Sequence, residues 1–240
     1  MIDHLLPPQV VAVESRGDDY PDGGLFPEEE ALVARAVAKR RREFTAARVC
    51  ARRALAQLGR PAAPILSGTR GEPLWPDGIV GSITHCDGYR GAVAADSSAV
   101  ASVGIDAEPN GPLPDGVLDT VALPEEAAFV RKQADDGGVS WGRLLFCAKE
   151  AVYKTWYPLT GRWLGFEEAR IDLTTDPVTA PGATPPATGS AAGAVAGGFR
   201  ARLLVDGPQV GGLAVQEFSG RWLAAEGLVL AAIVLPAPAG

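Results

Sequence analysis

One order of elements is predicted twice in this chain: a long helix followed by short antiparallel strands. In the first half, residues 28–58 form the expected helix, because three glutamates follow Pro27 where the helix dipole favours acids, and Gly59 ends the run. Strands are then expected at 79–85, 89–95 and 100–108. The pair Asp87-Gly88 is a strong two-residue hairpin signal between the first two of them.

The second half predicts the same order. Helices are expected at 124–133 and 141–157, and strands near 166–173, 199–205, 213–218 and 222–235. The doubled pattern indicates an α+β fold of two similar halves, each with a helix and an antiparallel three-stranded sheet, related by a pseudo-twofold. We place the halves at residues 1–104 and 105–240, with a cleft between them.

Residues 174–198 interrupt the second half. This stretch is rich in Pro, Gly, Ala and Thr and offers almost nothing to bury, so we expect a disordered surface insertion there. We assign it no chemistry.

The composition is that of a soluble enzyme, with 47% hydrophobic and 21% charged residues. The longest unbroken apolar run, 227–235, is shorter than the roughly 20 residues that a spanning helix needs. The N-terminus lacks a basic leader and a cleavage site, so we expect a cytoplasmic protein. Cys50, Cys86 and Cys147 are widely separated and form no CxxC motif, which indicates neither a disulfide framework nor a zinc site.

The distribution of charge is more informative than the net charge of −7, which argues against nucleic-acid binding. Residues 31–60 are strongly basic, and Glu43 is their single acid. Residues 101–130 contain acids and no Lys or Arg. Separate basic and acidic segments are what one polyanionic ligand and one divalent metal require, although solvated charged faces are the alternative.

Two carboxylates share one face of a predicted strand. In the stretch VGIDAE, period-two alternation places Gly104, Asp106 and Glu108 on the same side. Like charges at that spacing repel unless solvent or a cation lies between them. Oxygen ligands without His or Cys select Mg²⁺ or Mn²⁺ rather than zinc. The alternative is a wet strand end, and Gly104 leaves room beside the acids for something bulky.

The segment FCAKEAVYKTW, residues 146–156, is expected to be helical. At 100° per residue, one face gathers Phe146, Lys149, Glu150, Tyr153 and Lys154. Glu150 and Lys154 form a favourable i,i+4 pair, which is common on surface helices and is worth about 0.3–0.5 kcal/mol. Lys149 on the same face makes a cluster suited to phosphate oxygens, with Glu150 as a third carboxylate for a metal.

A histidine lies at the end of a predicted strand, in the stretch GSITHCDGYR. His85 is one of two histidines in the chain and precedes the tight turn. A structural role is the usual one for a lone histidine. Loops at strand ends often carry ligand groups, and the hydroxyls of Ser82 and Thr84 are placed to help His85 hold a phosphate.

These motifs together resemble the 4'-phosphopantetheinyl transferases, specifically the broad-specificity branch typified by the enterobactin- and surfactin-activating enzymes. SITHCDGYRGAV is similar to the family's Thr/Ser-His turn, GIDAEP to its metal strand and FCAKEAVYK to its (W/F)xxKEAxxK helix. The resemblance covers residues 43 to about 172 and, weakly, the last strands. Three motifs in the right order are specific, whereas any one alone is weak.

The resemblance implies transfer of the phosphopantetheine arm of coenzyme A to a serine of an apo carrier protein, with release of adenosine 3',5'-bisphosphate. By that similarity Mg²⁺, or Mn²⁺, is held by Asp106, Glu108 and Glu150. Pyrophosphate and nearby phosphate oxygens are bound by Lys149 and Lys154. The adenosine end and its 3'-phosphate are held by Arg48, Arg52, Thr84 and His85. Arg70, in TRGEP, stands where the family often has lysine; the charge is kept but the geometry changes.

The chemistry of the residues agrees with this assignment. Coenzyme A brings about four negative charges near neutral pH, and its pyrophosphate repels an oxygen nucleophile. A metal and lysines neutralise that charge and hold donor and serine in line, so the catalytic residues are expected to be Glu150, Lys149 and Asp106. The serine proton leaves to Glu150, to a metal-bound water, or by way of Glu125 or Glu126, and the sequence does not choose.

Two rival functions remain at this stage. The first is a Mg²⁺-dependent phosphohydrolase of nucleotides; the P-loop motif of most NTPases is absent. The second is a non-catalytic module that binds coenzyme A or a carrier protein. The doubled pattern resembles the monomeric branch of the family, so we expect a monomer. Fatty-acid, polyketide and nonribosomal-peptide carriers are all candidate partners, and the sequence does not distinguish them.

Overall fold

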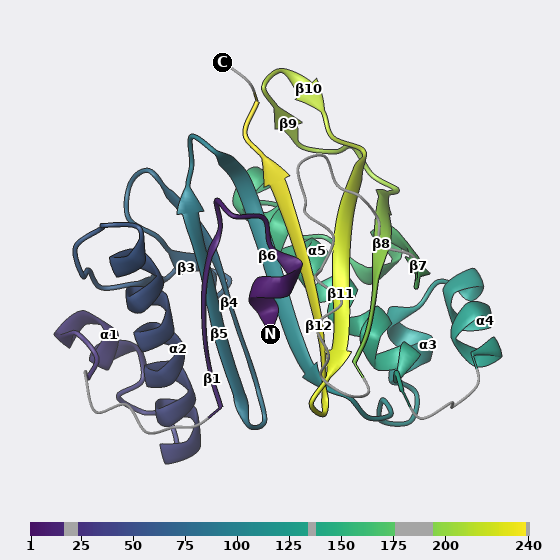
Figure 1. The fold of residues 1–240 in the computed structure, drawn as a ribbon, viewed down its shortest axis with the longest axis horizontal. Coiled ribbons are helices and arrows are strands. Elements are labelled where there is room, and N and C mark those ends of the chain that lie inside the picture. The colour runs from purple at the N-terminus through teal and green to yellow at the C-terminus, as the bar shows by residue number, and fades with distance from the viewer. Residues whose placement is uncertain (17–23, 134–137, 176–193, 239–240) are drawn as a thin grey trace.

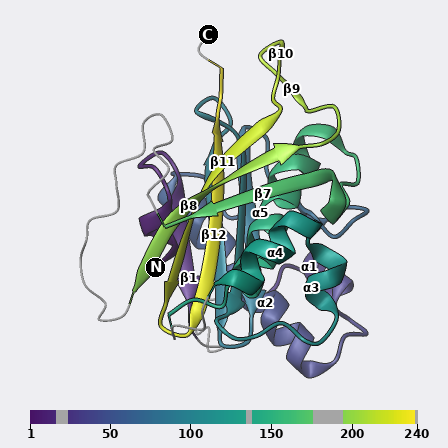
Figure 2. The ribbon, with the colours of Figure 1, turned by 90° about the vertical axis from the view of Figure 1, so that its right-hand side faces the viewer.

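The computed structural model describes residues 1–16, 24–133, 138–175 and 194–238, and it confirms the α+β class (Figure 1). Figure 2 shows strands gathered on one side of the molecule and the α-helices on the other. Within the described ranges, no helix combines the length and the apolar character needed to cross a bilayer.

The N-terminal half contains a three-stranded antiparallel sheet, in the order β1-β5-β4, with α2 packed against it. Its elements are η1 (Ile2–Leu5), β1 (Val11–Ser15), α1 (Pro27–Leu32), α2 (Ala38–Gln57), β2 (Leu66–Ser67), β3 (Pro73–Leu74), β4 (Ile79–Cys86) and β5 (Tyr89–Asp96). The hairpin between β4 and β5 is confirmed, and Gly88 adopts φ +73° there. Strand β1 was not predicted. The expected helix over 28–58 is two helices, because the chain turns back after Leu32.

The C-terminal half contains a five-stranded antiparallel sheet, in the order β6-β12-β11-β8-β7. Its elements are β6 (Val100–Pro109), α3 (Val117–Val121), α4 (Pro124–Lys132), α5 (Trp141–Thr160), η2 (Phe166–Glu168), β7 (Ala169–Thr174), β8 (Val195–Leu203), β9 (Gln209–Val210), β10 (Leu213–Ala214), β11 (Glu217–Ala225) and β12 (Leu228–Pro236). The expected three-stranded sheet is therefore wrong for this half.

Two boundaries differ from the sequence prediction. The expected strand over 222–235 is a hairpin, since Glu226 and Gly227 both take positive φ and reverse the chain between β11 and β12. The predicted insertion is shorter at both ends, because Thr174 belongs to β7 and Val195 begins β8. Its central residues, 176–193, lie outside the described part of the chain.

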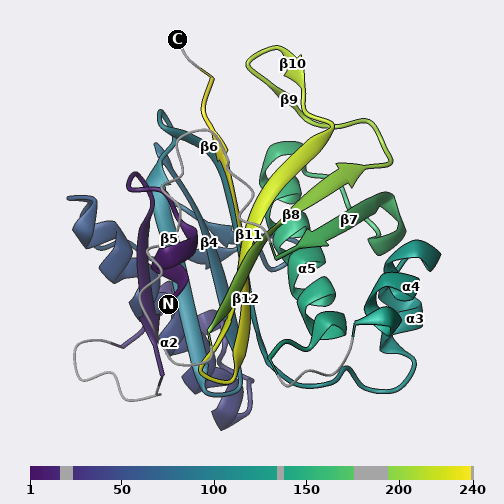
Figure 3. The ribbon, with the colours of Figure 1, turned by 45° about the vertical axis from the view of Figure 1, so that its right-hand side comes forward.

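Strand β6 connects the two halves. It was predicted as the third strand of the first meander, yet its backbone pairs with β12 of the second sheet. Its contact with β4 uses side chains: Ser82 Oγ accepts a hydrogen bond from the Ile105 N–H, and Thr84 Oγ1 accepts one from Ala107, both at 3.1 Å. The two sheets consequently lie side by side (Figures 1 and 3).

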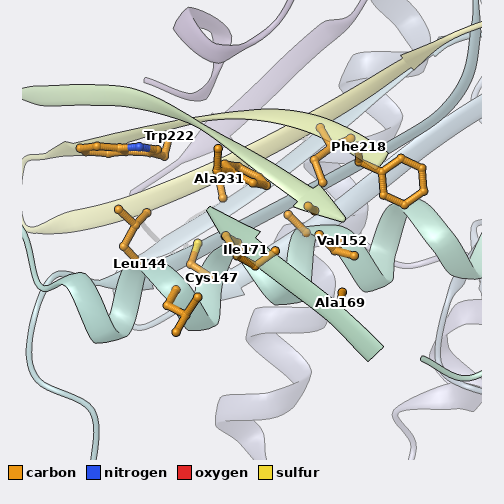
Figure 4. Close-up of a cluster of buried hydrophobic side chains, with 14 of the residues drawn as sticks. Leu144, Cys147, Val152, Ala169, Ile171, Phe218, Trp222 and Ala231 are labelled. Atoms are coloured by element: carbon orange, nitrogen blue, oxygen red, sulfur yellow. The ribbon is translucent and has the colours of Figure 1, made fainter. Parts of the chain in front are cut away.

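Each half buries its long helix against its sheet. In the C-terminal half, Leu144, Cys147 and Val152 of α5 pack against side chains of the sheet, among them Trp222 and Phe218 (Figure 4). The opposite face is covered at the junction of the halves by η1, whose Ile2 and Leu5 are buried. Gly104 brings β6 and α5 into close contact, since a Cβ there would overlap the carbonyl of Ala151.

The two halves share a sequence repeat that aligns without a gap. FPEEE, beginning at Phe26, corresponds to LPEEA, beginning at Leu123, and VCARRA corresponds to FCAKEA in α2 and α5. The repeat supports the predicted pseudo-twofold relation between the halves. It also pairs Glu29 with Glu126, two buried carboxylates that lie in the first turns of α1 and α4.

Candidate active site

A cleft of about 900 Å³ lies between the two halves. Its N-terminal wall comes from α2, from β4 and from the loop around β3, and its C-terminal wall comes from β6 and α5. The following predicted site residues line it: Arg48, Arg70, Thr84, His85, Asp106, Glu108, Glu150 and Lys154. The fold thus brings together most of the candidates from distant segments, whereas Arg52 and Lys149 do not line this cleft.

Asp106 is the most buried of the three predicted metal ligands, at 5% exposure. Its Oδ1 accepts hydrogen bonds from Thr84 Oγ1 at 2.9 Å and from Lys154 Nζ at 2.7 Å. Its Oδ2 is buried and has no hydrogen-bond partner among the described residues. Because an unsatisfied buried carboxylate oxygen is costly, this atom requires a donor or a cation that the described residues do not supply.

Glu108 and Glu150 face the same cleft. Burial raises the pKa of both carboxyls, and repulsion from Asp106 raises them further. Arg143 donates to Glu108 Oε2 at 3.1 Å and lowers the pKa of Glu108 in part. For Lys154, burial alone would lower the pKa, but its contact with Asp106 outweighs this and raises it. Burial and the charge of Asp106 therefore disfavour the ionised forms of Glu108 and Glu150.

The residues fit a hard divalent cation by donor chemistry. They offer carboxylate oxygens without His or Cys, one oxygen is orphaned, and their mutual repulsion would be relieved by positive charge. They are not gathered as a closed site: across the described residues, no group of three His, Cys, Asp or Glu side chains is placed to hold a metal ion. Lys154 pairs with Oδ1 of Asp106 and Arg143 with Oε2 of Glu108, so one oxygen of each carboxylate has a cationic partner.

Lys149 was predicted to face the cleft, but it does not line it. Its ammonium is 2.9 Å from Glu126 Oε2, and it donates to the carbonyls of Phe166 and Ala169 at 2.7 and 2.8 Å. Three partners use all three donors of an ammonium, so in this arrangement none remains for a phosphate. The helical projection put Lys149 on the cleft face, but α4 and the start of β7 cover that flank of α5.

Glu126 is accordingly a structural group in this arrangement. Its two oxygens accept hydrogen bonds from the Leu123 and Ile171 N–H groups, each at 2.6 Å, in addition to the Lys149 contact. Neither Glu126 nor Glu125 lines the cleft, which removes the geometric basis for either as the base that receives the serine proton.

The N-terminal wall of the cleft is cationic. Arg48 is 5% exposed and donates to the Ile65 carbonyl at 2.7 Å and to Ser67 Oγ at 3.1 Å. Burial lowers the pKa of Arg48 to about 10, which leaves it charged near neutral pH. Arg40 Nη1 lies 2.8 Å from His85 Nε2. Arg40 was not among the predicted site residues, because nothing in the local sequence distinguishes it from the neighbouring arginines.

Arg52 points away from this wall. It donates to both carboxylate oxygens of Glu29, at 3.0 and 2.8 Å, and to the Gly24 carbonyl at 2.7 Å. Glu29 also accepts from the Phe26 and Ile65 N–H groups. This arrangement is the counterpart of Lys149 on Glu126, and the sequence repeat was the signal that could have revealed both.

The loop that carries Arg70 reaches across to the second half. The Arg70 guanidinium lies 5.8 Å from the ring centroid of Trp163, and Thr69 Oγ1 is 3.4 Å from the hydroxyl of Tyr157. Trp163 is 62% exposed. Arg70 thus lines the cleft from one half while its guanidinium lies near an aromatic ring of the other.

Two family models match the chain, and together they span most of it. The 4'-phosphopantetheinyl transferase N-terminal domain matches residues 28–95, and the 4'-phosphopantetheinyl transferase superfamily matches residues 102–193. These matches define the class, a phosphopantetheinyl transferase built from two units.

Curated relatives place the chain within that class. It is 53% identical to 4'-phosphopantetheinyl transferase Svp of Streptomyces mobaraensis, over 100% of this chain and 91% of that protein. It is 54% identical to PptT of Mycobacterium tuberculosis, over 90% and 88%, and 48% identical to Npt of Nocardia iowensis, over 97% and 99%. The chain belongs to the 4'-phosphopantetheinyl transferase superfamily, and the predicted enzyme class is confirmed.

Proposed function

We propose that this enzyme transfers the 4'-phosphopantetheine group of coenzyme A to a serine of apo carrier proteins, in a Mg²⁺-dependent reaction that releases adenosine 3',5'-bisphosphate. The observation that carries the proposal is the composition of one cleft. A basic wall with Arg40, Arg48 and His85 faces an acid cluster with Asp106 and Glu150. A nucleotide with several phosphates and a divalent cation would satisfy both walls.

In this proposal coenzyme A contacts both walls of the cleft. The 3'-phosphate and the adenosine end lie against Arg48 and His85, with Arg40 beside them. Two nitrogens of Arg48 donate hydrogen bonds to the Ile65 carbonyl and to Ser67 in the free protein. The orientation of Arg48 is therefore fixed before the ligand binds. Arg70 reaches the phosphates from the rim. Lys154 exchanges its contact with Asp106 for pyrophosphate oxygens.

The metal is held by Asp106, Glu108 and Glu150, and when bound it supplies charge neutralisation at the pyrophosphate. Asp106 offers its orphaned Oδ2 for that purpose. Thr84 donates to the other oxygen of Asp106 at 2.9 Å and so keeps the orientation of the carboxylate when Lys154 turns to the pyrophosphate. Lys149 supports the site from outside the cleft, because it anchors α5 next to Glu150.

The reaction is one displacement at phosphorus. The serine oxygen forms a bond to the phosphorus that carries pantetheine, and the bond from that phosphorus to the bridging oxygen breaks, so the electron pair leaves with adenosine 3',5'-bisphosphate. The serine proton leaves to Glu150 or to water. No covalent enzyme intermediate is required.

The test is incubation with coenzyme A, Mg²⁺ and a panel of apo carrier proteins from fatty-acid, polyketide and nonribosomal-peptide systems, read by intact mass. We expect carriers to gain the mass of phosphopantetheine, and Asp106→Asn and Glu150→Gln to abolish the gain while Asp119→Asn, in an exposed pair with Arg131, retains it. Nucleotide hydrolysis without any carrier modification would favour a phosphohydrolase. Full transfer by Glu150→Gln would refute the metal assignment.

A further inference from the structure

Arg143 is a charged residue of α5 that the family motifs do not include and that the proposed reaction has not used. It lies in the first turn of α5, where a positive charge opposes the helix dipole. Its side chain is 18% exposed, and each of the three guanidinium nitrogens donates a hydrogen bond. The helix itself therefore gives no reason for an arginine at this position.

The guanidinium joins a metal-ligand candidate to the backbone that follows β6. Its Nη1 donates to Glu108 Oε2 at 3.1 Å, its Nε to the Gly111 carbonyl at 3.2 Å and its Nη2 to the Pro112 carbonyl at 2.7 Å. Two of the three contacts are to main chain, so the place of the guanidinium is set by the fold. Glu108 lies against a fixed cation through Oε2, and within the described ranges its Oε1 makes no hydrogen bond.

The loop after β6 does not depend on Arg143 alone. Asn110 accepts a hydrogen bond from the Ser140 N–H at 2.8 Å and donates to the Gly138 carbonyl at 3.0 Å. Ser140 Oγ also donates to Gly111 O at 2.8 Å. With the loop anchored by these contacts, the contribution specific to Arg143 is its hold on Glu108.

We propose that Arg143 is a positioning residue, which holds the Glu108 carboxylate toward the cleft and thereby raises the affinity of the site for its divalent cation. This inference rests on the proposed function, in which Glu108 is a metal ligand. A glutamate side chain loses rotamer freedom when it is ordered, and Arg143 imposes that order before the metal binds. Partners of this kind typically contribute about 10- to 100-fold to metal affinity.

The experiment measures metal binding apart from activity. Mn²⁺ is titrated into the full-length protein with and without coenzyme A, free Mn²⁺ is read by electron paramagnetic resonance, and coenzyme A alone is subtracted. We expect Arg143→Gln to weaken Mn²⁺ binding about tenfold, Arg143→Lys to restore part of it through a single donor, and Arg131→Gln, the exposed arginine paired with Asp119, to change nothing. In the Glu108→Gln background, Arg143→Gln should cause no further loss.

The kinetic consequence is a rise in the Mn²⁺ concentration needed for half-maximal transfer, with kcat largely restored at saturating metal. Unchanged Mn²⁺ affinity in Arg143→Gln would overturn the inference, and so would an equal loss in Arg131→Gln. A fall in melting temperature that accounts for the lost affinity, without rescue by Arg143→Lys, would also overturn it. Absence of Mn²⁺ binding by the wild-type protein would instead refute the metal role in the proposed function itself.

Discussion

The ammonium of Lys149 lies 2.9 Å from Oε2 of Glu126, and both side chains are almost fully buried. All three donors of Lys149 and both oxygens of Glu126 are satisfied, so the pair joins α4, α5 and the start of β7 into one network. Arg52 and Glu29 make the corresponding contact in the other half. The two helices that form the cleft walls are anchored in the same way.

Removing one member of the Lys149 pair is expected to cost stability rather than ligand affinity. Lys149→Met leaves the Glu126 charge buried without its partner, and we expect a loss of about 3–5 kcal/mol in the free energy of unfolding. Urea unfolding measures it, with the exposed Lys132→Met as the control. The double variant Lys149→Met with Glu126→Gln should recover part of the loss. If Lys149→Met has normal stability but weakened coenzyme A binding, the result would instead support a phosphate-binding role for Lys149.

Gly104 sets the distance between β6 and α5, and through it the contact of Lys154 with Asp106. A Cβ at this position would overlap the Ala151 carbonyl and Thr155 Oγ1, so Gly104→Ala is expected to destabilise by about 1–3 kcal/mol and to reduce transfer. Gly142→Ala is the matched control in the same pair of elements, because its Cβ meets only ordinary contacts and helix propensity favours alanine. Thermal unfolding compares the two; equal stability would contradict the packing role.

The sequence predicted best those features that depend on local geometry. Alternation along β6 placed Gly104, Asp106 and Glu108 on one face, and α5 is the bulky neighbour that Gly104 admits. Asp87-Gly88 located its hairpin because the turn needs a positive φ. The Glu226-Gly227 turn was missed because glutamate seldom takes that conformation.

Features that depend on tertiary packing were beyond a reading of local pattern. A helical projection has no information about α4, so it placed Lys149 and Glu150 on the same face. In the structure Lys149 is paired with Glu126, whereas Glu150 faces the cleft. Arg40, Arg48 and Arg52 likewise stand on one helix, and only the fold separates cleft residues from the partner of Glu29.

The ionised carboxylate of Glu150 is destabilised in the free protein. Burial and the negative charge of Asp106 disfavour its ionised form, which the raised pKa reflects. We therefore expect Glu150→Gln to raise the melting temperature at neutral pH while it abolishes transfer. Mg²⁺ at 100 times its Kd should stabilise the wild-type protein by about 2.7 kcal/mol and leave the variant unchanged. Scanning calorimetry with and without Mg²⁺ measures both effects, and equal stabilisation of the two proteins would argue against Glu150 as a ligand.

Substitutions of Arg48 and Arg52, which both lie on α2, are expected to have different effects. Arg48→Gln is expected to weaken coenzyme A binding about ten- to hundredfold, since a charged hydrogen bond in a buried site contributes about 1.5–3 kcal/mol. Arg52→Gln is expected to lower stability by leaving the Glu29 carboxylate, which is 0% exposed, without its cation. Isothermal calorimetry and urea unfolding on both variants give the comparison. Loss of affinity in Arg52→Gln at unchanged stability would reverse the assignment.

The pH dependence of stability is expected to report on His85. Partial burial lowers its pKa below the ordinary 6.5, and nearby cations lower it further against the opposing charge of Glu43. These cations are Arg40, Lys154 and Arg90. Because the unfolded chain binds the proton more readily, the stabilising contribution of neutral His85 is present above pH 6.5 and is lost as the pH falls toward the lower folded-state value.

His85→Gln should therefore flatten the decline in stability below pH 6.5, by a modest amount because the ring is exposed at the cleft mouth. Coenzyme A should also reduce the decline in the wild-type protein, since a bound phosphate favours the protonated ring. Urea unfolding between pH 5 and 7.5 measures both, and His4→Gln is the control because His4 is the other histidine of the chain. If His4→Gln and His85→Gln flatten the curve equally, the effect does not come from the cleft.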